Sequence, residues 1–84
     1  MLTRELVINN SQGLHARPAT LLVQKATTFK CEVSIEYNGK CANAKSLIGV
    51  LSLGVNKGCS VKLITNGTDE ENALAEITAV VQGL

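Results

Sequence analysis

Residues 31–37 alternate strictly between apolar and polar side chains and are followed by an Asn-Gly pair. A period of two predicts a β-strand with one buried and one solvated face. Asn38-Gly39 is the strongest two-residue hairpin signal, because both residues tolerate positive φ. The chain must therefore return along residues 40–44 as an antiparallel partner strand, with Cys41 opposite Glu36 on the solvated face.

The rest of the chain divides into strands of period two and helices with an apolar stripe. Two helix starts carry specific signals. Ser46 is a preferred N-cap residue, and Thr68-Asp69-Glu70-Glu71 is a T-x-x-E capping box. The expected elements are strands over 2–8, 31–37, 40–44 and 60–66, and helices over 16–28, 47–53 and from the capping box to the C-terminus.

The element order β-α-β-β-α-β-α predicts an α+β fold. With 84 residues the chain can build one core, so we expect a single domain over residues 1–84. A four-stranded antiparallel sheet covered on one face by three helices buries every apolar face in two layers. The first helix then joins two strands that have another strand between them, in a right-handed split crossover.

Charge and hydropathy exclude several classes of protein. A net charge of +1 gives no general attraction for nucleic acid or for an anionic membrane. No apolar run reaches the roughly 18 residues that a membrane span needs. The first residues lack the basic and apolar regions of a signal peptide. We therefore expect a cytoplasmic protein that does not insert into membranes.

The sequence also offers no site for a cofactor. Cys31, Cys41 and Cys59 are widely spaced and form no C-x-x-C pair, so we expect free thiols and no metal. No P-loop pattern occurs. A small split βαβ domain that binds RNA is an alternative, but such domains stack bases on aromatic residues of the sheet. Tyr37 is the only aromatic residue in the expected strands, which argues against that alternative.

The heptapeptide Gly13-Leu14-His15-Ala16-Arg17-Pro18-Ala19 holds the only histidine and the only proline. His15 lies just before the first turn of a helix, where the N–H groups of Ala16 and Arg17 lack intrahelical partners and attract anions. Arg17 can bind two phosphate oxygens at once. This positive surrounding favours the neutral, nucleophilic imidazole. His15 is thus a candidate acceptor of a phosphoryl group; the alternative is a histidine that only caps the helix.

The short helix expected after Ser46 is apolar nearly all round, and one sheet face cannot bury all of its sides. Some of its side chains should form an exposed patch for a partner. A phosphate on Ser46 would sit at the helix N-terminus and place negative charge beside that patch. The alternative is that Ser46 is an ordinary N-cap. The apolar residues are Leu47, Ile48, Val50, Leu51 and Leu53.

Residues 13–19 resemble the active-site signature of the histidine-containing phosphocarrier (HPr) family of the bacterial sugar phosphotransferase system. Residues 43–54 resemble the regulatory-serine signature of the Gram-positive-type members. The segments 38–40 and 67–70 also match, so the resemblance covers essentially the whole chain. It implies an open-faced β-sandwich, in agreement with the element order above.

The resemblance implies a phosphoryl carrier, which is not an enzyme that turns over alone. A phosphoryl group from phosphoenolpyruvate would pass through Enzyme I to Nδ1 of His15 and then to IIA components of sugar permeases. Arg17 would hold the phosphoryl oxygens, together with the backbone N–H of Ala16. The residues that fall where the family docks both partners are Thr20, Leu47, Ile48 and Leu51.

The resemblance also implies regulation. In Gram-positive-type members a dedicated ATP-dependent kinase/phosphorylase modifies the serine that matches Ser46. The phosphoserine form slows transfer from Enzyme I and acts as corepressor for a catabolite-control transcription factor. The second hypothesis is a mainly regulatory binding module controlled at Ser46. A paralogue that lacks the histidine serves regulation only, and His15 argues against that paralogue. We expect a monomer.

Overall fold

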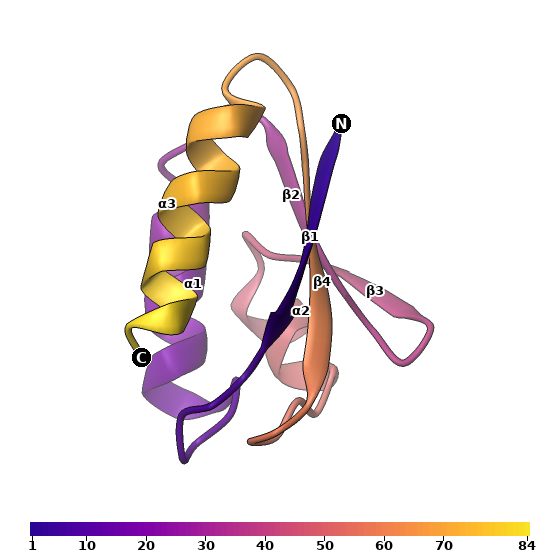
Figure 1. Ribbon diagram of the computed structural model, residues 1–84, viewed down its shortest axis with the longest axis vertical. Coiled ribbons are helices and arrows are strands. Elements are labelled where there is room, and N and C mark those ends of the chain that lie inside the picture. The colour runs from indigo at the N-terminus through magenta and orange to yellow at the C-terminus, as the bar shows by residue number, and fades with distance from the viewer.

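Four strands form one sheet, accompanied by three helices. The computed structural model describes all of residues 1–84. The elements are β1 (Leu2–Val7), α1 (Ala16–Ala26), β2 (Glu32–Tyr37), β3 (Lys40–Asn43), α2 (Leu47–Ser52), β4 (Ser60–Asn66) and α3 (Glu70–Gln82). Figure 1 shows α1 and α3 side by side along one face of the sheet, and no helix on the other face. α2 packs against α1 and β3. The predicted α+β fold is confirmed.

The strand order in the sheet is β1-β4-β2-β3, and every neighbouring pair is antiparallel. β4 lies between β1 and β2, as the split crossover requires. The hairpin between β2 and β3 turns at Asn38 and Gly39, whose φ angles are 54° and 81°. Positive φ at both positions defines the type I′ turn that suits the twist of the strands. Glu36 pairs with Cys41, as predicted.

The alternation predicted for the strands is seen in their burial. Val33 and Ile35 of β2 and Val61, Leu63 and Thr65 of β4 all face the helices and are buried.

All three cysteines are free thiols, and none of the helices has the length and apolar character needed to cross a bilayer. The 19 buried residues of the core are Leu6, Ile8, Leu14, Ala19, Leu22, Ala26, Cys31, Val33, Ile35, Ala44, Val50, Leu53, Val55, Val61, Leu63, Ala73, Leu74, Ile77 and Val81.

Helix α1 ends at Ala26, two residues earlier than predicted. Thr27 and Thr28 donate their hydroxyl hydrogens to the carbonyl oxygens of Gln24 and Lys25, at 2.8 and 2.7 Å. These side chains satisfy carbonyl groups that have no partner in a helix end. The apolar stripe continues past this point, but the hydrogen bonds of the last turn stop the helix.

The predicted capping box at the start of α3 is wrong. The N-cap is Asp69 rather than Thr68, and its side chain makes no capping bond. The Asp69 carboxylate instead accepts the backbone N–H groups of residues 30–31, at 2.8 and 2.9 Å. Glu70 takes over the reciprocal role by accepting the N–H of Gly67 at 3.1 Å. The two N–H groups at the start of β2 need an acceptor, and the Asp69 carboxylate supplies it. The Asp69 side chain is therefore not free to cap α3.

Asp69 makes fold stability depend on pH. The Lys30 backbone N–H, which donates to the carboxylate, holds the pKa of Asp69 below its ordinary value. A lowered carboxyl pKa stabilises the fold above the unfolded value of about 3.9, and this contribution is lost as pH falls through the lower folded value. Asp69→Asn should therefore reduce the midpoint of urea unfolding at pH 7, and this deficit should shrink at about pH 3.

Glu71→Gln is the matched control, because it removes a carboxylate from the same helix end without breaking a bond to the entrance of β2. It should change the midpoint much less than Asp69→Asn does. A deficit of Asp69→Asn that stays the same at both pH values would contradict this account.

Candidate functional site

His15 occupies the N-cap position of α1 in an extended conformation, with φ −118° and ψ 159°, and its side chain makes no capping bond. The imidazole is therefore not engaged in capping the helix. The ring is half-buried, and its Nε2 lies 2.9 Å from Oδ1 of Asn56. Nothing in the local sequence pairs these residues, which are 41 positions apart.

The loop before α1, residues 8–15, is held against the segment 55–59 by backbone hydrogen bonds; we call these the His15 loop and the 55–59 segment. Leu14 N–H donates to Val55 O at 3.0 Å. Ile8 N–H donates to Cys59 O at 2.9 Å, and Ile8 O accepts the N–H of Gly58 at 2.6 Å. The extended backbone around His15 is thus set by a segment far away in sequence.

Gly13 allows this close approach. Its φ is +62°, and a Cβ atom at this position would clash with the carbonyl oxygen of Val55 and lie 2.8 Å from Cα of Asn56. Asn10 completes the loop by donating its side-chain N–H to Gly13 O at 2.7 Å. Only glycine offers both the left-handed backbone and the absence of a side chain here.

Ala16 has a φ of 51°, in the left-handed region that costs a non-glycine residue about 1 kcal/mol. The only other such residue is Asn38, where the type I′ turn requires it. Two contacts hold the strained position: the bond from Leu14 to Val55 before it, and the Thr20 hydroxyl, which donates to Ala16 O at 3.2 Å. Backbone strain of this kind is concentrated at functional sites.

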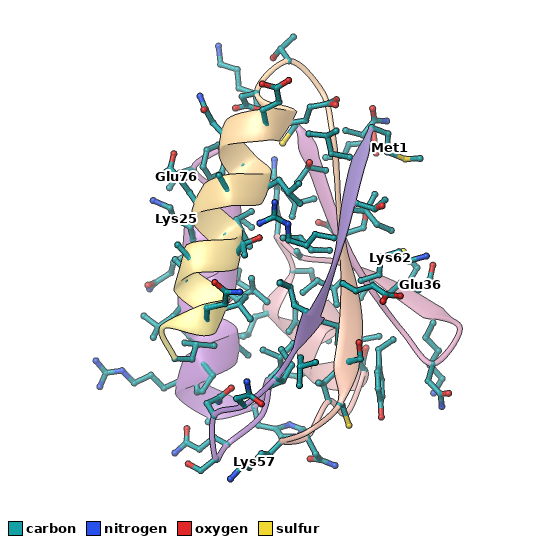
Figure 2. The ribbon with its side chains drawn as sticks, viewed as in Figure 1. Met1, Lys25, Glu36, Lys57, Lys62 and Glu76 are labelled. Carbon is teal, nitrogen blue, oxygen red and sulfur yellow. The ribbon has the colours of Figure 1, made fainter.

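The charges at this end of the molecule are unpaired. Arg17 is exposed and makes no ion pair, while Pro18 beside it is buried. Lys57, next to Asn56, projects at the same end as the loop between β1 and α1 (Figure 2). The two ion pairs of the protein, Met1–Glu70 and Lys25–Glu76, lie elsewhere. The N–H groups of the first turn add further positive potential, so the site is suited to an anion.

Helix α2 has the features expected from its sequence. The Ser46 hydroxyl oxygen accepts the N–H of Gly49 at 3.1 Å, which confirms the N-cap. Val50 is fully buried, whereas Leu47, Ile48 and Leu51 are 39%, 81% and 37% exposed. These three residues, which we call the α2 patch, lie on a helix that packs against α1.

Asn56 is the site residue that the sequence did not reveal. Asn56-Lys57-Gly58 indicates only a turn, and a turn asparagine carries no signal for a histidine in another loop. No group of three or more His, Cys, Asp or Glu side chains lies close enough to hold a metal ion. The arrangement can bind or accept an anion at an accessible imidazole, and it encloses no substrate.

The fold and the site together define a small open-faced α+β protein that presents one accessible histidine beside an unpaired arginine. The family described as the PTS HPr component phosphorylation site matches residues 2–83. The chain belongs to this HPr family of the phosphotransferase system, as a Gram-positive-type member. Members of this family are phosphocarrier proteins and not catalytic enzymes.

Solved structures agree with this assignment. HPr-C-His from Thermoanaerobacter tengcongensis is 42% identical with a TM-score of 0.97, covering 99% of this chain and 93% of that one. Phosphocarrier protein HPr from Bacillus anthracis is 40% identical with a TM-score of 0.92, covering 96% of each chain. Crh from Bacillus subtilis, a catabolite repression protein seen as a swapped, intertwined dimer, is 43% identical with a TM-score of 0.79, covering 99% and 95%.

Gly13→Ala should destabilise the protein by about 2 kcal/mol, because strain at positive φ is joined by a clash with the 55–59 segment. Gly54→Ala is the matched control, since Gly54 has a φ of +68° and open space around it. Urea unfolding of both variants separates backbone strain from the clash. Equal losses in the two variants would show that the close approach at Gly13 contributes nothing.

Proposed function

We propose that this protein carries a phosphoryl group on His15 from Enzyme I, which is loaded by phosphoenolpyruvate, to IIA components of sugar permeases in the cytoplasm. The observation that carries this proposal is the accessible His15 ring, which does not cap α1 and lies two residues from the unpaired Arg17. A carrier must meet two partners in turn, and a residue at an open helix end is accessible to both.

The chemistry follows from the groups at the start of α1. Nδ1 of His15 attacks phosphorus, and the phosphoryl oxygens are held by the Arg17 guanidinium and the Ala16 N–H. The helix N-terminus favours the dianionic group electrostatically. These groups are provided by the chain itself, so the transfer needs no cofactor.

Partner docking is assigned to the α2 patch together with Thr20 on α1. The patch places three aliphatic side chains in solvent on a helix that adjoins α1. Apolar side chains of this kind provide the buried centre of an interface, surrounded by polar groups. One surface would serve Enzyme I and the IIA components in turn, with the protein acting as a monomer.

Ser46 is proposed as the control point. An ATP-dependent kinase/phosphorylase would add phosphate to the hydroxyl that caps α2, next to Leu47 of the α2 patch. The charge is accommodated at the helix N-terminus but opposes docking on the patch. Loading by Enzyme I would slow, and the phosphoserine form would bind a catabolite-control transcription factor as corepressor. The similarity to Crh, a catabolite repression protein, supports this regulation.

His15→Ala should abolish the acid-labile label that the protein acquires from Enzyme I and phosphoenolpyruvate, because the acceptor nitrogen is lost. Arg17→Ala should keep the acceptor but slow loading about 100-fold, because one donor to the phosphoryl oxygens is removed. Quenched-flow labelling followed by site mapping measures both. Labelling of His15→Ala at the rate of the unmodified protein would refute the proposal.

Substitutions of Ser46 separate its capping role from its regulatory role. Ser46→Ala should cost about 1 kcal/mol of stability through the lost cap but leave loading by Enzyme I unchanged. Ser46→Asp retains an N-cap residue and adds a negative charge, so it should slow loading and increase binding to the catabolite-control factor. If Ser46→Asp behaves like the unmodified protein in both assays, Ser46 is an N-cap alone.

A further inference from the structure

The contact between His15 and Asn56 determines where the hydrogen of the neutral imidazole lies. Nε2 and Oδ1 are 2.9 Å apart, the usual length of an N–H···O hydrogen bond. An amide oxygen has no hydrogen to donate, so Nε2 must be the donor. A neutral imidazole carries one N–H, and Nδ1 is then left with a free lone pair.

From this geometry we infer that Asn56 is a positioning residue, which holds His15 in the Nε2–H tautomer and keeps Nδ1 available as the nucleophile. The bond also restricts rotation of the ring. Nδ1 is bonded to Cγ, the ring carbon that is attached to Cβ. It is therefore the ring nitrogen nearer to the backbone at the start of α1. Asn56 contacts neither substrate nor the reacting nitrogen, and it acts through His15.

Asn56 is itself well supported. Its backbone oxygen accepts the N–H of Cys59 at 3.2 Å, which closes the turn of the 55–59 segment. Val55, immediately before it, is fully buried and binds Leu14, which is also fully buried. The residues immediately before His15 and Asn56 are thus joined by a backbone hydrogen bond, and both are buried. The side-chain contact itself is exposed, but the backbone on both sides of it is anchored to buried residues.

The inference rests on the proposed function for its consequence in phosphoryl transfer. The Nδ1 lone pair forms the bond to phosphorus, while the bond from phosphorus to the phosphorylated partner protein breaks and its electron pair leaves with the partner. No proton has to leave the His15 ring. The ring gains positive charge, so its bond from Nε2–H to Asn56 becomes charge-assisted and stronger in the loaded state. Asn56 therefore favours loading as well as the correct tautomer.

The tautomer can be measured without any partner protein. Long-range ¹⁵N–¹H NMR spectra of the full chain at about pH 8 should show the Nε2–H form in excess. Asn56→Ala should lower the ratio of the Nε2–H to the Nδ1–H form about fivefold, the loss expected for one hydrogen bond. Asn72→Ala, an exposed asparagine on α3, is the matched control and should leave the ratio unchanged. An excess of the Nδ1–H form in the unmodified protein would overturn the inference.

Loading by Enzyme I and phosphoenolpyruvate gives the second readout. Asn56→Ala should slow loading about fivefold. Asn56→Asp places a carboxylate where the amide oxygen meets Nε2, and it stabilises the doubly protonated ring, which has no lone pair at Nδ1. Loading of this variant should therefore be slowed more at about pH 6 than at about pH 8. The same pH profile for Asn56→Asp and the unmodified protein would contradict the positioning role.

The two proposals fail differently. If the unmodified protein acquires no label on His15, the proposed function is wrong, whereas the NMR ratio still reports the effect of Asn56 on the ring. If the protein loads normally and Asn56→Ala changes neither the tautomer ratio nor the rate, the positioning role is wrong and the carrier function stands. The NMR spectrum of each variant also shows that the fold is retained.

Discussion

The site depends on one backbone contact, the close approach of the His15 loop to the 55–59 segment at Gly13. A side chain at this position would clash with the opposite backbone, so the two segments meet only because glycine is there. The bond from Leu14 to Val55 and the bonds around Ile8 then determine the direction in which the chain enters α1. The N-cap position of His15, the strained Ala16 and the reach of Asn56 all follow from this contact.

The site is open, and its charges are left unpaired. Arg17 has no acidic partner, and the carboxylates that form ion pairs lie elsewhere on the molecule. An enzyme would enclose such a histidine to exclude water. In a carrier the same residue must be accessible to a donor and an acceptor, so precise orientation has to come from hydrogen bonds within the chain. The contact with Asn56 is the one side-chain bond that the ring makes.

Helix α2 shows how a small domain can keep apolar side chains exposed and still hold the helix in place. Val50 anchors the helix in the core and Ser46 caps its first turn, so the helix keeps its shape while the α2 patch stays in solvent. The cap and the proposed control point are the same hydroxyl. A phosphate added there changes the charge beside the patch without requiring a change in fold.

Much of this protein could be predicted from local sequence. The alternation in β2 and its Asn-Gly turn specified a hairpin with defined faces, and Ser46 was correctly assigned as a cap, because periodicity and short-range hydrogen bonds are local properties. The start of α3 was mispredicted, since Asp69 binds N–H groups nearly forty residues away. Asn56 was not found for the same reason: its partner His15 is brought to it by packing of the core, and no local pattern encodes that contact.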